Sequence, residues 1–186
     1  IARIPEVGTV ALGAVGLCFP LIIMITAFSN LFGSGGAPIF SIYRGMNENG
    51  RAQTVVNTSF TMVCACGIVL MTIGLVFARP VLVLFGASES ALVYAYPYMM
   101  IYLIGTVPSM LTIGMNPFIN AQGYATTGMI SVMIGAAANL ILDPLFIFAF
   151  HLGIEGAAIA TVISQIMSAC FVIIFLRRKA EYKIRL

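Results

Sequence analysis

Asn139 and Asp143 place an amide and a carboxylate four residues apart inside an otherwise apolar stretch. In a helix this spacing puts both side chains on one face, a single turn apart. Pro144 follows directly and has no N–H, so it cannot donate to the Leu140 carbonyl one turn earlier. A carboxylate, an amide oxygen and a freed carbonyl can together hold a hard cation, and the carboxylate alone can take a proton. We therefore expect a cation-binding turn here, with Pro144 as a hinge.

A second polar pair, Thr161 and Gln165, lies one turn apart in the next apolar segment. The tight turn between the two segments makes them antiparallel neighbours, and Asp143 and Thr161 lie at similar distances from that turn. At about 1.5 Å of rise per residue they should sit at similar depth. Thr161 and Gln165 are thus candidates to complete the site. The alternative is that Asn139 and Asp143 only hold neighbouring helices together by hydrogen bonds.

The composition around these residues is that of a membrane protein. Hydrophobic residues make up 61% of the 186 and charged residues only 8%, with a mean hydropathy of +1.07, whereas a soluble domain has about 25% charged residues. An Asp in the middle of a membrane helix costs roughly 2.5–3.5 kcal/mol, so it normally faces protein or water and marks a path for an ion, proton or substrate. The carboxylate of Asp143 is therefore a functional candidate.

The apolar runs are long enough to cross a bilayer, which needs about 20 residues per helix. We expect the first run to be broken only at Pro20 and at residues 33–38, and the second to stop at Arg79-Pro80. Alternating strands of a barrel are absent from the pattern. The sequence predicts an all-α, polytopic bundle that forms a single membrane domain over residues 1–186, with five spans at about residues 7–43, 54–78, 92–115, 126–150 and 156–176.

Basic residues predict the orientation. With five spans, the loop at residues 44–51 and the tail at residues 177–185 lie on one side and hold most of the Lys and Arg residues. The positive-inside rule makes that side cytoplasmic. The N-terminus then begins outside, so we expect that at least one further helix precedes Ile1.

Catalytic patterns do not assemble from this sequence. It has one His, no Ser-His-Asp set, no zinc signature and no phosphate or dinucleotide loop, so it predicts no catalytic residue, no cofactor, no transition-metal site and no nucleic-acid partner. The cluster Gly33-Ser34-Gly35-Gly36 lacks the Lys and the preceding strand of a phosphate loop. Clustered small residues in a membrane helix instead favour close helix packing.

Two stretches resemble a known family, the multidrug and toxic compound extrusion (MATE) transporters. The likeness extends from about Val10 to Leu176 and depends on the order and spacing of its parts. The turn Asn139…Asp143-Pro144, followed by residues 156–161 (GAAIAT), is similar to the fifth and sixth helices of the family. Residues 33–47 (GSGGAPIFSIYRGMN), followed by Arg51-Ala52, are similar to the cytoplasmic end of the second helix of the family.

The resemblance implies a secondary transporter with two six-helix lobes, which exports organic cations or amphipathic drugs in exchange for protons or sodium ions. This chain would carry helices two to six of the N-terminal lobe in the plasma (inner) membrane, and its partners would be the bilayer, a small cationic or amphipathic substrate, the first helix and the second lobe. Asn139, Asp143 and Thr161 match the family's cation-site positions, whereas Gln165 is added from helix geometry alone. The family places a further carboxylate on its first helix.

Two other functions remain open. Flippases for lipid-linked saccharides share a related lobe plan, and a membrane subunit that transports nothing could use Asp143 only to fix helix pairing. No Lys or Arg lies within a predicted span. This favours a cationic or neutral substrate over the pyrophosphate of a lipid-linked sugar.

Overall fold

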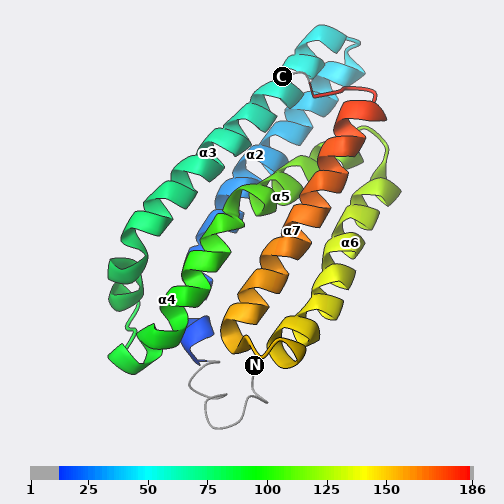
Figure 1. Ribbon diagram of the computed structural model, residues 1–186. Helices are drawn as coiled ribbons and strands as arrows, with labels where there is room; N and C mark the ends of the chain where they lie inside the picture. Colours follow the sequence, from blue (N-terminus) through cyan, green and yellow to red (C-terminus); the bar gives the residue numbers. More distant parts are fainter. Residues whose placement is uncertain (1–12, 185–186) are drawn as a thin grey trace.

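The computed structural model describes residues 13–184, and every regular element in that range is helical (Figure 1). Four stretches are long and apolar enough to cross a membrane, and α4 with α5 forms a fifth that is bent by 54°. Four of the five predicted spans are therefore confirmed, and the third is confirmed if α4 and α5 cross as one bent span; residues 7–12 of the first lie outside the described residues. The elements are α2 (Phe19–Gly45), α3 (Asn49–Leu84), α4 (Glu89–Ile104), α5 (Thr106–Ala121), α6 (Ala125–Pro144), the π-helical turn η1 (Leu145–Ala149) and α7 (Gly153–Arg178).

Left-handed residues terminate three of the helices. Asn47, Gly86 and Gly123 follow α2, α3 and α5 with φ angles of 58°, 88° and 91°. The N–H of the residue after each of them donates a hydrogen bond to the carbonyl five residues earlier, at 2.9–3.1 Å. This hydrogen bond satisfies a carbonyl that the helix end leaves open. The turn residues seen in the sequence thus become helix stops.

Three of the predicted breaks and boundaries are wrong. The first span is not broken at residues 33–38, because α2 runs from Phe19 to Gly45 with Pro38 inside the helix. The second span does not stop at Arg79-Pro80, because α3 continues through Pro80 to Leu84. A proline inside a membrane helix is tolerated where neighbouring groups satisfy the backbone. The third span is not a single run, because it breaks at Gly105 and continues as α5 to Ala121. Pro108 explains the break, since it has no N–H to donate to the Ile104 carbonyl.

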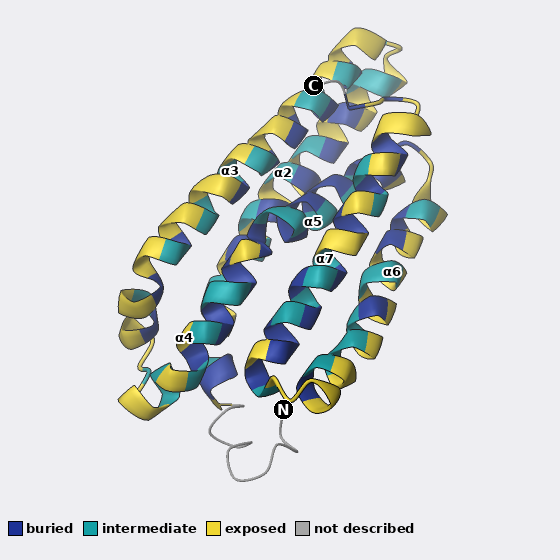
Figure 2. Ribbon diagram, in the orientation of Figure 1, coloured by how far each residue is buried: buried dark blue, intermediate teal, exposed yellow. Residues whose placement is uncertain are grey.

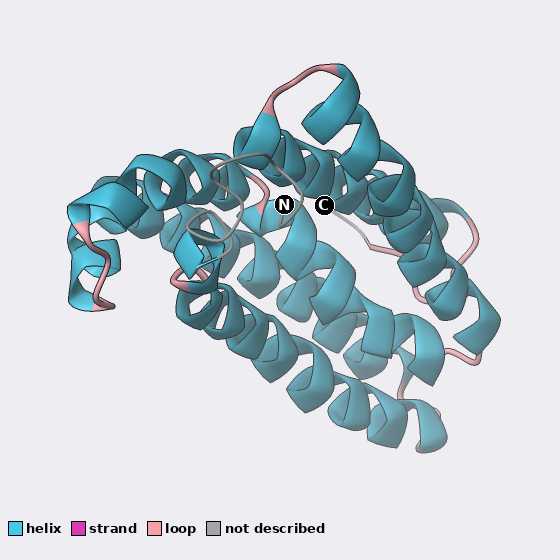
Figure 3. Cartoon of the chain, turned by 90° about the horizontal axis from the view of Figure 1, so that it is seen from below, coloured by secondary structure: helices cyan, strands magenta, loops and turns pink. Residues whose placement is uncertain are grey.

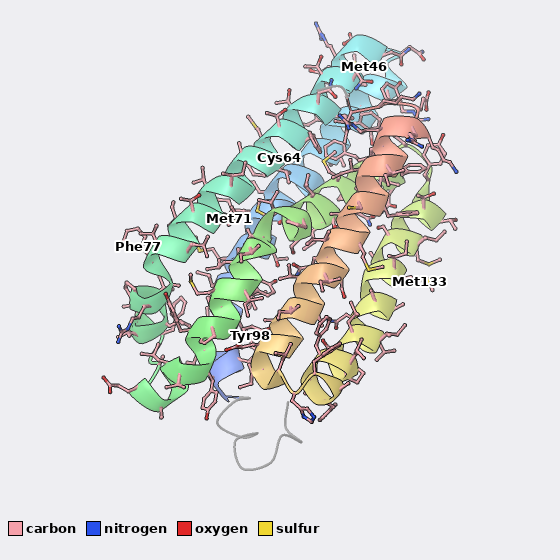
Figure 4. All side chains as sticks on the ribbon, in the orientation of Figure 1. Met46, Cys64, Met71, Phe77, Tyr98 and Met133 are labelled. Carbon is pink, nitrogen blue, oxygen red and sulfur yellow. The ribbon has the colours of Figure 1, made fainter. Side chains whose placement is uncertain are left out.

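The helices bury one face and expose the other (Figure 2). α2, α3 and α5 pack together, while α6 packs on α7 and α5 at one edge of the bundle. Figure 3 shows the same helices from below, joined by short loops. Phe77 on α3 and Met133 on α6, at opposite sides of the bundle (Figure 4), are 52% and 59% exposed. Large apolar side chains on the outside are expected where lipid is the solvent.

Glycines bring α2 against its neighbours. A Cβ on Gly33 would lie 2.6 Å from the Gly114 carbonyl oxygen of α5, and one on Gly36 would lie 2.7 Å from the Phe118 ring and the Ser59 hydroxyl oxygen. Gly35, between them, faces open space. The close packing predicted for this cluster is therefore present at Gly33 and Gly36.

The chain folds back across one end of the bundle after α7. Residues 179–184, which we call the strap, bury Tyr182 in an edge-on contact with Phe40 at 5.0 Å between ring centroids. The Tyr182 hydroxyl lies 2.5 Å from the Asn49 side-chain oxygen. Glu181 forms an ion pair of 2.8 Å with Arg44. The strap therefore joins α2, α3 and α7 at the end that carries the Arg44–Arg51 loop (Figure 1).

Candidate functional site

Asn139 on α6 lies at the centre of the polar cluster. Its amide nitrogen donates to the Asp143 carboxylate at 3.1 Å and to the Thr161 hydroxyl oxygen at 3.4 Å. The Thr161 hydroxyl itself donates to the Ala157 carbonyl at 2.9 Å. Three of the predicted residues thus meet between two antiparallel spans, at the similar depth expected from the sequence.

Asp143 is half-buried and faces protein rather than lipid alone. Among residues 13–184, the ion pairs are Arg44–Glu181 and Arg51–Glu48, so none of them neutralises this carboxylate. Both lie at the other end of the bundle. A carboxylate in a membrane span without a fixed basic partner can exchange a mobile cation.

Pro144 ends the regular part of α6 directly beside Asp143. It cannot donate to the Leu140 carbonyl, and the next N–H, that of Leu145, goes to Leu142. Beyond it the chain winds as the π-helical turn η1, a distortion that often occurs at functional sites. The predicted interruption at Pro144 therefore coincides with a change of helix type.

Gly156 lets α7 approach this turn. A Cβ at Gly156 would lie 2.8 Å from both the carbonyl carbon and the oxygen of Phe146 in η1. The Leu152 N–H also donates to the Phe146 carbonyl, at 3.2 Å. The start of α7 is thus in direct backbone contact with the turn that follows Asp143-Pro144.

A cavity of about 280 Å³ opens between α5, α6 and α7. Its wall combines apolar side chains with small polar ones and includes Asn139, Thr161 and Gln165. Gln165 lies one turn beyond Thr161, and its Oε1 atom packs against Gly105 at the bend between α4 and α5. Gln165 therefore shares the cavity with the Asn139 cluster but makes no hydrogen bond to Asn139 or Asp143 among the interactions described.

Several polar residues of this region had not been singled out from the sequence. Ser164 and Ser168 repeat the three- and four-residue spacing of Thr161 and Gln165 on α7, and that spacing could have revealed them. Asn116 on α5 donates to the Gly128 carbonyl and the Ser131 hydroxyl of α6, each at 3.0 Å. These contacts fix α6 to its neighbours away from Asp143.

Comparison with known proteins identifies the family. The sequence profile of the MatE family matches residues 2–145. This chain belongs to the MATE family. Members of the family are transporters rather than enzymes. The long apolar helices of the described residues agree with a membrane protein of this family.

Relatives and solved structures of MATE proteins agree with this membership. The chain is 31% identical over 170 residues to multidrug export protein MepA of Staphylococcus haemolyticus, which covers 91% of the chain and 38% of MepA. It is similar to a crystal structure of MATE in the bent conformation, with a TM-score of 0.91 and 26% identity over 97% of the chain and 40% of that protein. A Pyrococcus furiosus transporter of the MOP superfamily, described as having a binding pocket of reverse polarity, has a TM-score of 0.88 at 26% identity, covering 94% of the chain and 39% of that protein.

The chain spans about two fifths of the length of these MATE proteins. The described helices thus correspond to part of each of these proteins.

Proposed function

We propose that this chain is part of the N-terminal lobe of a secondary exporter of organic cations or amphipathic drugs, driven by inward flow of protons or sodium ions. The observation that carries the proposal is the Asn139 amide, which joins Asp143 on α6 to Thr161 on α7. In this proposal the site is completed by a carboxylate from a preceding helix, and a second lobe closes the cleft.

The coupling cation acts on the hydrogen bonds of Asn139. While Asp143 is charged, it accepts from the amide nitrogen. A proton on Asp143 weakens it as an acceptor, and a sodium ion draws the Asn139 and Thr161 oxygens toward itself. Either event changes the link between α6 and α7.

The small residues at the start of α7 convert that change into movement. Gly156 already contacts the turn that follows Pro144, and Ala157 and Ala160 are buried on the same helix. A different bend at Pro144 therefore requires α7 to repack. The lobe then favours either the inward-open or the outward-open cleft, while a cationic substrate competes for the negative site.

The wall of the cavity offers no basic group to an anionic cargo. Among the described residues, none that line it is basic. The longer α3 does bring Arg79 inside a span, contrary to expectation, but Arg79 lines a separate hollow with Glu89 near the end of α3. An anionic pyrophosphate headgroup would therefore find no basic partner in this cavity.

We infer that the protein lies in the cell membrane. The end that bears Arg44, Arg51 and the strap then lies on the cytoplasmic side. The described basic residues other than Arg79 gather there, and basic loops are retained on the cytoplasmic side.

The test is export by the full-length transporter in proteoliposomes. Asp143→Asn should abolish gradient-driven export of a fluorescent cation, because the site loses its charge while keeping its shape. Glu155→Gln is the control, since this exposed carboxylate lies near the same end of the bundle. Full, gradient-dependent export by Asp143→Asn would refute the assignment. A sodium gradient imposed at fixed pH, compared with a pH gradient without sodium, distinguishes the coupling ions.

A further inference from the structure

A second hollow lies between α3 and α4 and shares no residue with the cavity described above. Its volume is about 360 Å³, and it is lined by Arg79, Glu89, Leu92, Val93 and Tyr96. This volume falls within the range of about 300–1,000 Å³ that is usual for small-molecule sites. The two helices pack on each other (Figure 1). The hollow therefore combines one cation and one anion with an apolar and aromatic wall.

Arg79 and Glu89 have no partner among the described residues. The ion pairs within residues 13–184 lie at the other end of the bundle, and neither side chain takes part in a described hydrogen bond. Both side chains are exposed. A cation and an anion that share a hollow without pairing with each other are complementary to a ligand that carries both charges.

Arg79 lies at the level where a bilayer has its headgroups. α3 has 36 residues, so it is about 54 Å long at about 1.5 Å per residue, whereas the hydrocarbon core is about 30 Å thick. Both ends of α3 thus extend beyond the hydrocarbon, and Arg79 is close to the end at Leu84. Tyr96, in the same wall, is of the residue type that collects at this interface. The ligand that meets this hollow is therefore a lipid headgroup.

The two charges follow the order of charges in a zwitterionic headgroup. Arg79 is more than one helical turn inside α3, whereas Glu89 begins α4 beyond the turn that ends α3, so Glu89 lies farther from the membrane centre. In a glycerophospholipid the phosphate lies next to the acyl chains and the amine lies outside it. Arg79 thus matches the phosphate, which a guanidinium binds well, and Glu89 matches the amine. This order is the same in both leaflets.

We propose that the hollow binds a zwitterionic phospholipid with a primary amine, the class of phosphatidylethanolamine, with Arg79 on its phosphate and Glu89 on its ammonium group. A primary ammonium carries three N–H donors for the carboxylate. The ammonium of phosphatidylcholine carries only methyl groups, and phosphatidylglycerol has no positive charge to offer Glu89. The inference concerns the bilayer and not the cargo, so it goes beyond the proposed export.

The test is native mass spectrometry of the purified full-length transporter, titrated with these three lipids carrying identical acyl chains. The native protein should bind phosphatidylethanolamine about ten-fold more tightly than phosphatidylcholine, the lower end of the effect of a hydrogen bond between charged groups. Phosphatidylglycerol should also bind more weakly, because Glu89 repels it. Soluble phosphoethanolamine at the same concentration should not displace the lipid. Displacement would assign the hollow to free phosphate esters and overturn the lipid assignment.

Three single variants separate the two contacts. Glu89→Gln should reduce the ten-fold ratio to about one and strengthen the binding of phosphatidylglycerol, because the repulsion is removed. Arg79→Gln should weaken the binding of phosphatidylethanolamine and phosphatidylcholine alike, because both lose the phosphate contact. Glu155→Gln is the matched control and should keep the native ratio. Like Glu89, Glu155 is an acidic residue in the first turn of its helix, but it does not line the hollow.

A double variant tests the order of the charges. Arg79→Glu combined with Glu89→Arg still allows the two side chains to pair with each other, but it reverses their order along the membrane normal, so it should lose the preference for phosphatidylethanolamine. A preference that survives in this variant or in Glu89→Gln overturns the inference, as do equal affinities of the native protein for the three lipids. None of these outcomes depends on whether Asp143 couples export to a cation.

Discussion

The contact between Gly33 and Gly114 allows a sharp test of how the helices are packed. A Cβ on Gly33 would lie 2.6 Å from the Gly114 carbonyl oxygen and 3.0 Å from its Cα, both backbone atoms of α5. An ordinary contact begins near 3.4 Å, so Gly33→Ala requires α2 and α5 to separate by roughly 0.8 Å, the difference between these distances. Overpacking of this kind typically costs about 1–3 kcal/mol.

The same helix supplies two matched comparisons. Gly35→Ala adds the same methyl group two residues away, where nothing lies within 4 Å, so it should be neutral or slightly stabilising because Ala favours helix. Gly36→Ala meets the Phe118 ring and the Ser59 hydroxyl, which are side chains that can move. We expect the cost to decrease in the order Gly33, Gly36, Gly35.

The assay is the apparent midpoint of thermal unfolding of the purified full-length transporter in detergent. At about 2–4 °C per kcal/mol for chains of this size, and less for the whole transporter, Gly33→Ala should lower the midpoint by a few degrees. An equal loss in Gly33→Ala and Gly35→Ala would refute the reasoning, because the close approach of α2 and α5 would then have no energetic consequence.

Two further contacts can be tested in the same preparation. Asn116→Leu removes two hydrogen bonds to α6 and should cost about 1 kcal/mol, as for interhelical bonds in membranes; it should lower the midpoint more than Asn120→Leu, whose exposed amide makes one bond of 3.3 Å. Equal midpoints would contradict this role of Asn116. Tyr182→Phe keeps the ring contact but loses the hydroxyl bond to Asn49, so amide exchange in the strap should accelerate when followed by mass spectrometry. Exchange at the native rate would show that this hydroxyl does not anchor the strap.

The spans could be predicted because lipid imposes a length on each helix, and turn residues such as Asn47, Gly86 and Gly123 mark where helices stop. The bend at Gly105 was not predicted because mean hydropathy is the same for straight and bent helices, although Pro108 marks its place in the sequence. The continuation of α3 through Pro80 was not predicted, because the rule that a helix ends before a proline describes chains in water. The strap was missed because its contacts join residues distant in sequence.

The cluster of Asn139, Asp143 and Thr161 was predictable because polar residues in an apolar run are conspicuous and helical spacing fixes their faces. The cavity was not, because it depends on how α5 approaches α6 and α7. Ser164 and Ser168 are small hydroxyl residues that helices often carry without any function. Their place in the wall became evident only once α5 was positioned beside them.

The central claim is that Asp143 holds a mobile cation, and counting that cation tests it most directly. The purified full-length transporter and its Asp143→Asn variant can be titrated with sodium by calorimetry, and with substrate while proton release is recorded. The account predicts that the native protein takes up sodium, or releases a proton when substrate binds, and that Asp143→Asn does neither. Identical heats and identical proton release in the two proteins would contradict it.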